Sequence, residues 1–327
     1  MKRRKARALV MFSGGLDSIL AVKLLQKQGI RIVGINFVTP FSNPEIPSRI
    51  AKGIGIKLRT LRVSRGYFDM LRNPRHGYGA NMNPCLDCKV YMLKRAKFFA
   101  KKIKADFIAT GEVVGERPFS QSKSQLLLIE REAGLKDRIV RPLSARLLPP
   151  TEAETMGLVE RKRMMAIQGR PRKLQMKLAK RFGIRDYPTP GGGCLLTDKA
   201  FSRKLRDFIA HNKTLGWRDV ELLKPGRHFR LGRSKIIVGR NEQENMVLHS
   251  IAKKQRLPWM EVNDYNSPVT VLQGSTRNLI RKAAGLTVRY SDAPKKEVKV
   301  RHVDGREEKT IRSKPMRKKE LEKLRIA

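Results

Sequence analysis

The sequence contains few acidic residues, few cysteines and no long apolar stretch. Against 72 Lys and Arg stand 29 Asp and Glu, so the 327-residue chain carries a formal net charge of +43. Its three cysteines are too few for a secreted disulfide scaffold. No apolar run approaches the ~18–20 residues of a membrane helix, and the apolar stretch at 8–12 is too short for a secretory signal. We therefore expect a cytoplasmic protein that does not enter a membrane, with cysteines that serve chemistry.

The excess of positive charge is spread over the whole chain. Residues up to Ala200 include 41 Lys and Arg against 15 Asp and Glu, and the rest of the chain has 31 against 14. A hydrophobic content of 40% is enough for a folded core. A surface of the thermophilic type would balance its lysines with glutamate, and this one does not. A folded chain with this charge is expected to bind a polyanion, of which nucleic acid is the common example.

The order of apolar runs predicts a parallel α/β sheet in the first 200 residues. Alternating strands and helices of this kind are typical of a Rossmann-like, doubly wound sheet with helices on both faces. Residues 149–182 are expected to be helical and basic. Strands are expected at 6–12, 30–38, 56–63, 107–110, 125–130 and 139–143, and helices at 19–28, 48–52 and 86–103.

Composition changes after about residue 200, where a second, smaller α+β domain is expected. It should contain a helix at 201–212 and strands at 226–231, 235–238, 269–272 and 286–290. We expect a first domain at 1–198, a linker at 199–215, the second domain at 216–312 and a charged arm, helical or loose, at 313–327.

A glycine loop with the sequence SGGLDS, residues 13–18, joins the first strand to the first helix. Glycines let the backbone approach a phosphate, and free N–H groups at a helix N-terminus attract it. The loop lacks the lysine of a Walker A motif, so backbone and serine hydroxyls would hold the anion. A plain turn with a serine N-cap is the alternative, and spacing alone does not separate the two. Asp17 could orient a metal or substrate, or it could satisfy the helix dipole.

The cysteines fall in two places. Cys85 and Cys88 form a C-x-x-C pair before a basic helix, and Cys194 follows three glycines at 191–193. A C-x-x-C pair can be a redox dithiol, half a zinc site or part of an iron–sulfur site, and no histidine lies near Cys194 to complete a zinc site. Three thiolates without a fourth ligand suit a [4Fe–4S] cluster with one open iron. Reaction of Cys88 and Cys194 alone, with Cys85 as a small packed residue, is the alternative.

These motifs resemble those of a known family. SGGLDS after a first strand resembles the PP-loop of the ATP pyrophosphatases, which cleave ATP between its α- and β-phosphates and adenylate a substrate. NPCLDCK at 83–89 resembles the cysteine motif of tRNA thiouridine synthetases. Residues 110–112, Gly115, 120–122 and 141–143 resemble segments of the 4-thiouridine enzymes.

The resemblance implies an ATP-dependent tRNA sulfurtransferase that adenylates a base carbonyl and replaces its oxygen with sulfur. ATP would need Mg²⁺ to neutralise its charge. Thiouridine synthetases come in a persulfide type and in a cluster type with C-x-x-C plus a distant cysteine, and this chain has the latter pattern. The sulfur donor would be a protein or inorganic sulfide, and the modified nucleotide and a homodimeric state stay open.

The resemblance also implies roles for individual residues. Catalytic roles fall to Asp17, Cys85, Cys88 and Cys194, and the three cysteines would be the cluster ligands. Contacts with ATP are expected from Ser13, Gly14, Gly15, Asp17, Ser18, Phe37 and Gly111.

A second resemblance concerns the C-terminal domain. Residues 226–231, 235–245 and 283–293 resemble the RNA-binding module of the NFACT proteins of ribosome quality control, the alternative being a generic basic α+β domain. The 4-thiouridine enzymes usually carry a THUMP region before the PP-loop, for which a first strand starting near residue 8 leaves no space. We therefore expect the C-terminal domain to bind tRNA. Expected RNA contacts, in charge runs that otherwise form solvated faces, are Lys89, Lys94, Arg95, Arg170, Arg172, Arg227, Arg230 and Arg240.

Two other functions stay open. Another PP-loop ligase, adding an amine to a base or carboxylate, would not need three cysteines. A nucleotide-sensing RNA- or ribosome-binding factor without thiolation activity would keep full activity when the cysteines are replaced.

Overall fold

The chain divides into two compact units, Met1–Leu195 and Leu196–Ala327. The structure, a computed structural model, describes residues 5–42, 45–188, 193–294 and 296–326. Gly191 and Gly192, part of the glycine run before Cys194, lie outside the described residues. Of the described helices, none has both the length and the apolar content needed to cross a membrane.

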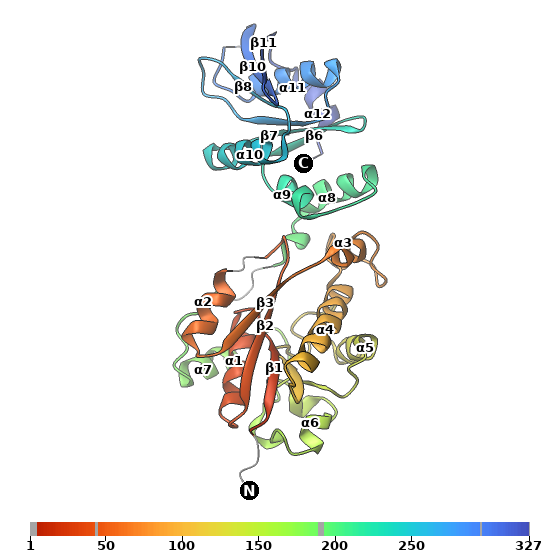
Figure 1. Ribbon diagram of the computed structural model, residues 1–327, viewed down its shortest axis with the longest axis vertical. Helices are drawn as coiled ribbons and strands as arrows, with labels where there is room; N and C mark the ends of the chain where they lie inside the picture. The colour runs from red at the N-terminus through yellow and green to blue at the C-terminus, as the bar shows by residue number, and fades with distance from the viewer. Residues whose placement is uncertain (1–4, 43–44, 189–192, 295, 327) are drawn as a thin grey trace. The chain divides into compact units, whose positions relative to one another are not determined.

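The first unit is built on a five-stranded parallel sheet in the order β3-β2-β1-β4-β5. Leu9 of β1 packs against α4 and α5 on one face, while Ala8 and Val10 face α1 and α2 on the other (Figure 1). Burial on both faces explains why the central strands β1 and β4 are mostly apolar, whereas the edge strand β3 carries charged residues and is largely exposed. The strands are β1 (Arg7–Met11), β2 (Arg31–Val38), β3 (Lys57–Arg62), β4 (Phe107–Thr110) and β5 (Ile139–Val140).

The helices of this unit cover both faces of the sheet, which confirms the predicted Rossmann-like fold class. The chain turns to opposite sides of the sheet from β1, so a crevice opens at the carboxyl ends of β1 and β4. The helices are α1 (Leu16–Gln26), α2 (Glu45–Gly53), α3 (Arg65–Arg72), α4 (Cys85–Lys102), α5 (Lys123–Ala133), α6 (Glu152–Thr155) and α7 (Lys173–Arg181).

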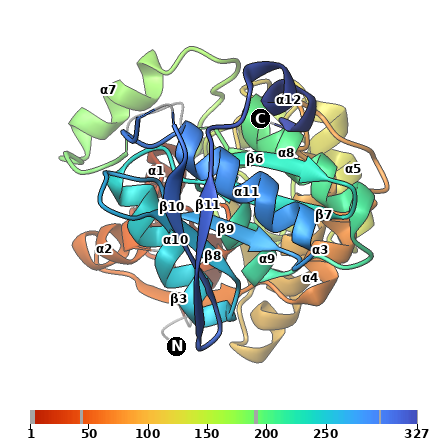
Figure 2. The same ribbon diagram turned by 90° about the horizontal axis from the view of Figure 1, so that it is seen from above.

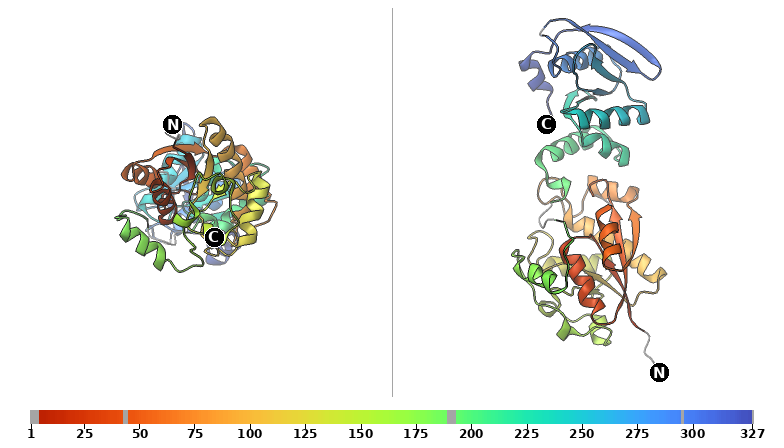
Figure 3. Two further views of the ribbon diagram at one scale, coloured as in Figure 1. Left: turned by 90° about the horizontal axis from the view of Figure 1, so that it is seen from below. Right: turned by 90° about the vertical axis from the view of Figure 1, so that its left-hand side faces the viewer.

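The second unit contains a six-stranded antiparallel sheet in the order β11-β10-β8-β9-β7-β6. Helix α11 crosses one face (Figure 2), and α9 and α10 cover part of the other. The long β10–β11 hairpin is drawn in blue in Figure 3. The strands are β6 (Arg227–Leu231), β7 (Ser234–Val238), β8 (Trp259–Val262), β9 (Thr270–Gln273), β10 (Val298–Asp304) and β11 (Glu307–Ser313).

Helices occupy both ends of the second unit as well. The segment expected to be a linker contains α8, whose Lys204 ammonium donates to the carbonyls of Leu223, Lys224 and Gly226 at 3.0–3.3 Å. The segment expected to be a charged arm contains α12. The helices are α8 (Lys199–His211), α9 (Trp217–Leu223), α10 (Glu242–Gln255), α11 (Arg277–Arg289) and α12 (Lys318–Leu324).

Three predicted elements were wrong. Residues 125–130 belong to α5, because Leu126, Ile129 and Ala133 share a buried face and Ser122 caps the helix by accepting from the Gln125 N–H. Residues 286–290, predicted as a strand, fall in and just after α11, where Thr276 provides the N-cap. Residues 149–182 are helical only in α6, α7 and the short 3₁₀ turn Arg161–Arg163.

Candidate active site

The glycine loop lies where β1 ends and α1 begins. Gly14 has φ +76°, and a Cβ there would lie 2.9 Å from the Cα of Pro47, so a side chain would not fit. The Gly15 N–H donates to the Ser13 hydroxyl at 3.2 Å, and the Ser18 hydroxyl donates to the Gly15 carbonyl at 2.8 Å. These contacts fold the loop tightly at the N-terminus of α1.

Gly111 brings the end of β4 against this loop. A Cβ at Gly111 would lie 2.6 Å from both the carbonyl carbon of Asp17 and the nitrogen of Ser18. Real Cβ atoms do not approach backbone this closely, so glycine is required for the two segments to meet. The close approach places the residues that follow β4 beside the start of α1.

A cavity of about 470 Å³ opens at this edge of the sheet. Its walls come from the glycine loop, the first turns of α4, the loop after β4 and the start of α7. Gly14, Cys88, Cys194 and Phe37 are not among its lining residues, and Phe37 packs in the core with Leu9 and Val90. The cavity is lined by Ser13, Gly15, Asp17, Ser18, Cys85, Lys89, Gly111, Glu112, Glu116, Arg117, Ser120, Gln121 and Arg172, among others.

Asp17 faces a second carboxylate and an arginine in this cavity. The Arg172 guanidinium lies 2.6 Å from Glu116 and 3.9 Å from Asp17. Desolvation and the neighbouring Glu116 raise the pKa of Asp17 to about 6, although Arg172 opposes the shift. Asp17 Oδ1 is buried and accepts no hydrogen bond among the described residues, so it is open to a ligand.

Lys89 and Glu112, which line another wall, belong to a chain of buried charges. The Lys89 ammonium pairs with Glu112 at 2.6 Å, and the Arg141 guanidinium donates to Glu112 at 3.1 Å and to Glu130. Arg141 is almost wholly buried, with 1% of its side chain exposed. Burial would raise the pKa of Glu112, but Lys89 and Arg141 lower it to about 2. Glu112 is therefore a carboxylate that fixes Lys89 beside the cavity.

The three cysteines lie in one region of the first unit. Cys85 begins α4 and lines the cavity. The Cys88 thiol donates to the Tyr67 hydroxyl at 3.9 Å, and burial raises the pKa of Cys88 to about 12, with smaller contributions from Cys194 and Cys85. Within the described ranges, no three His, Cys, Asp or Glu side chains gather closely enough to hold a metal ion.

The basic residues expected to bind RNA fall into two groups. Lys94, Arg95 and Arg170 are exposed. The others make contacts inside their own unit: Lys89 and Arg172 line the cavity, Arg227 lies 4.5 Å over the Tyr290 ring, Arg230 donates to Asp207, and Arg240 donates to Glu244.

Sequence reasoning missed Glu116, Gln175 and Tyr67. Gln175 is fully buried in α7 next to Asp17, and Tyr67 reaches Cys88 from α3. The Glu-x-x-x-Glu spacing of Glu112 and Glu116 in the loop after β4 could have indicated the second acid. No pattern in the sequence marks Gln175 or Tyr67.

Two domain families match the chain. Residues 4–146 match the family described as thiamine biosynthesis protein (ThiI), and residues 226–325 match the NFACT protein RNA binding domain. The first unit thus resembles a PP-loop domain, and the second unit resembles an RNA-binding domain of the NFACT type. The predicted resemblance, to PP-loop tRNA thiouridine synthetases in the first unit and to the NFACT module in the second, is confirmed.

Individual relatives match over shorter stretches. The chain is 28% identical over 136 residues to the tRNA-specific 2-thiouridylase MnmA of Karelsulcia muelleri (strain GWSS), covering 37% of this chain and 35% of that protein. It is 30% identical over 138 residues to MnmA of Marinobacter nauticus, and this match also covers 37% of this chain and 35% of that protein. The chain therefore spans about a third of the length of these relatives.

A solved structure also resembles the chain at the level of the fold. It is described as a 4-thiouridine synthetase–RNA complex with bound ATP, and it is 19% identical, with a TM-score of 0.35. The match covers 54% of this chain and 50% of that one.

We predict that Arg141→Met destabilises the first unit by about 3–5 kcal/mol, because removing one partner leaves the Glu130 carboxylate buried without its cation. The free energy of opening, measured by amide hydrogen exchange in β4 and α5, should fall by this amount. Arg146→Met, at an exposed position nearby, should change it by less than about 0.5 kcal/mol. Glu130→Gln in the Arg141→Met chain should restore part of the loss, and equal effects of the two arginine variants would contradict the role of the buried network.

Proposed function

We propose that this protein is an ATP-dependent tRNA sulfurtransferase working in the cytoplasm. One observation carries the proposal: the SGGLDS loop and Cys85 line the same cavity. The matches of residues 4–146 to the ThiI family and of 37% of the chain to 2-thiouridylases support it. A phosphate-binding loop and a thiol in one cavity suit a reaction in which ATP activates a base and sulfur then adds to it.

The cavity fits ATP in its size and in its chemistry. Its volume lies within the range of small-molecule sites. Ser13, Gly15 and Ser18 would hold phosphate through backbone and hydroxyl groups. The free oxygen of Asp17 and the neighbouring Glu116 would hold Mg²⁺, which when bound neutralises phosphate charge.

The reaction needs two displacements. The carbonyl oxygen of the base attacks the α-phosphorus of ATP, and pyrophosphate leaves with the electron pair of the broken P–O bond. A sulfide-level sulfur, from a donor protein or inorganic sulfide, then adds to the ring carbon, and AMP leaves with the former carbonyl oxygen. The balance is ATP plus the oxo base and hydrosulfide giving AMP, pyrophosphate and the thio base, with no net oxidation.

The three cysteines would carry or position the sulfur that is transferred to the base. Their thiols suit iron as donors, and three of them would leave one iron of a [4Fe–4S] cluster open. As placed, however, the three thiols do not form a ligand set for a metal ion. The finer proposal is that Cys85, Cys88 and Cys194 bind this cluster, and a persulfide on Cys88 or Cys194 is its alternative.

The second unit supports tRNA as the substrate. Its match to the NFACT protein RNA binding domain covers residues 226–325. Exposed Lys94, Arg95 and Arg170 on the first unit would add phosphate contacts.

A nucleotide-sensing RNA-binding factor is the second candidate function. The raised pKa of Cys88 favours it, because a thiol that stays protonated at neutral pH is a poor nucleophile. Such a protein would bind ATP and RNA without changing a nucleoside.

Nucleoside analysis of tRNA separates these functions. Deleting the gene should remove one thionucleoside, detected by mass spectrometry of digested tRNA, and the wild-type gene should restore it. Cys194→Ser should fail to restore it, whereas Lys102→Ala, at an exposed position on α4, should restore it fully. An unchanged thionucleoside profile in the deletion strain would favour the RNA-binding factor.

ATP binding should depend on pH through Asp17. Since its pKa is about 6, the carboxylate that would hold Mg²⁺ is lost as the pH falls through 6. Calorimetry should show Mg·ATP affinity falling about tenfold for each pH unit below that point. Asp17→Asn should bind weakly and without this slope, while Asp69→Asn, an exposed control, should keep it. A slope that persists in Asp17→Asn would assign the titration to another group.

The cluster proposal predicts a coloured protein. Purified without oxygen, the protein should be brown, with absorbance near about 400 nm from thiolate-bound iron. Cys85→Ala should lose this absorbance, and Ser120→Ala, which changes another cavity residue, should keep it. Colourless protein containing zinc would contradict the cluster.

A further inference from the structure

A second cavity, of about 400 Å³, lies wholly within the second unit. It opens between the last turns of α10, the start of β8 and the neighbouring strand β10, on the sheet face opposite α11. The sulfur-transfer proposal makes no use of it. Its lining combines the aromatic rings of two residues with the positive charges of three others. These residues are His249 and Trp259, and Lys253, Arg256 and Arg301.

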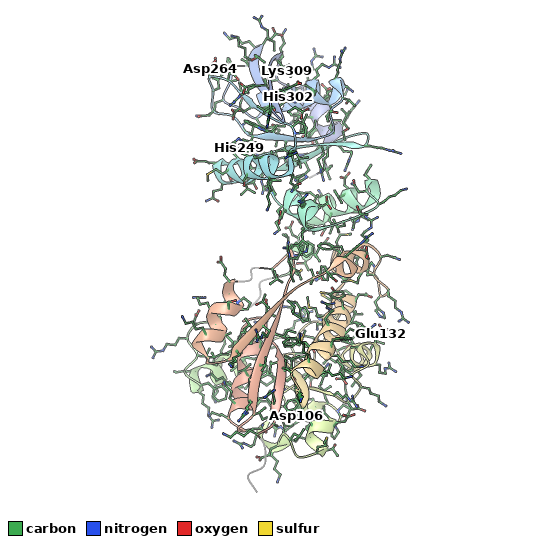
Figure 4. The ribbon with its side chains drawn as sticks, in the orientation of Figure 1. Asp106, Glu132, His249, Asp264, His302 and Lys309 are labelled. Carbon is green, nitrogen blue, oxygen red and sulfur yellow. The ribbon has the colours of Figure 1, made fainter. Side chains whose placement is uncertain are left out.

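One wall of this cavity is built from three flat side chains that lie next to one another. The Arg301 guanidinium lies 5.5 Å from the centre of the Trp259 ring. The His249 ring, on α10 (Figure 4), meets the same tryptophan edge-on at 4.6 Å. Trp259 is 7% exposed and therefore fixed in place by the core beneath it. The wall is thus rigid and built from planar surfaces.

Two carboxylates hold Arg301 in position. Its terminal nitrogens donate to Glu261 at 3.1 Å and to Glu308 at 2.7 Å. The guanidinium nevertheless stays 40% exposed, and its Nε–H is buried without an acceptor among the described residues. The Arg301 guanidinium is planar and charged, its two terminal nitrogens are held by carboxylates, and its Nε–H has no acceptor. It therefore offers a preformed surface for a flat, polar ligand.

The rim of the cavity carries two more cations. Lys253 and Arg256 are exposed, and neither makes an ion pair within the described part of the chain. Arg256 ends α10 with φ +55°, which directs the chain sharply into β8. Desolvation and the nearby charges of Lys253 and Arg301 lower the pKa of His249, so its ring is neutral and offers both a donor and an acceptor.

We propose that this cavity binds one unstacked nucleotide of single-stranded RNA. The base would lie against the Arg301–Trp259 wall, since bases stack on guanidinium and aromatic planes. Lys253 and Arg256 would hold the adjoining phosphates. The volume is sufficient for one nucleotide. That the RNA is tRNA rests on the proposed function, whereas the site itself rests on the geometry of the second unit.

Tryptophan fluorescence reports on this site directly. The chain has two tryptophans, so Trp217→Phe leaves Trp259 in the cavity wall as the sole emitter. An eight-nucleotide uridine oligomer added to the full-length variant should change its emission in a saturable way. Uridine monophosphate, which offers the same base with a single phosphate, should bind at least about tenfold more weakly, because neighbouring phosphate contacts are lost. If Trp217→Phe does not fold, polarisation of a labelled oligomer with the wild-type protein measures the same binding.

Two variants and a matched control test the rim. Lys253→Ala and Arg256→Asn should each weaken oligomer binding about fivefold and lower the slope of log affinity against log salt by about 0.7. Asparagine is used at Arg256 because it tolerates the left-handed backbone. Lys254→Ala removes the same charge from the neighbouring position on α10, which does not line the cavity, and should change affinity by less than about twofold.

Three results would overturn the proposal. Equal losses for Lys253→Ala and Lys254→Ala would mean attraction to general surface charge. Unchanged Trp259 emission would place the RNA elsewhere, and equal binding of the monophosphate and the oligomer would make this a site for free nucleotides. None of these readouts needs sulfur transfer, so an unchanged thionucleoside profile in the deletion strain would leave the RNA site standing.

Discussion

The candidate active site depends on one buried arginine. Arg141, at the end of the β5 region, neutralises Glu112 from the loop after β4 and Glu130 from α5, and Glu112 in turn holds Lys89 on α4. Four segments that are distant in sequence are thereby tied together, and two of them, α4 and the loop after β4, line the cavity. Buried charges are costly unless they are paired, so this network has only one well-satisfied arrangement. The position of Cys85, one turn before Lys89 on the same helix, follows from it.

The fold was largely predictable because the central strands of the first sheet are buried on both faces and appear as apolar runs. The prediction was wrong at 125–130 and 286–290, where leucine-rich or β-branched residues form strand-like runs while capping and i, i+3 burial favour a helix. The contents of the cavity were less predictable. The SGGLDS loop has a local signal, whereas Glu116 and Arg172 become neighbours of Asp17 only through the tertiary fold.

The positive charge of a residue did not by itself predict whether the residue binds RNA or pairs with an acid of its own unit. Lys89, Arg172, Arg230 and Arg240 all pair with acids of their own unit, and those acids are scarce in the chain. Many of the few Asp and Glu residues therefore hold particular Lys and Arg side chains in place, as Glu261 and Glu308 do for Arg301. The cations that remain unpaired, such as Lys253 and Arg256, are then the better candidates for phosphate.

The chemistry of Cys88 places a requirement on any sulfur transfer at this site. Its pKa of about 12 means that the folded protein alone does not stabilise a thiolate there. The Lys89 ammonium on the same helix lowers this pKa, but it also pairs with Glu112, and an added positive charge would lower the pKa further. A metal ion supplies such a charge and deprotonates a coordinating thiol outright. Cysteine reactivity that rises when a metal ion is added would therefore favour a sulfurtransferase over a protein that only binds nucleotide.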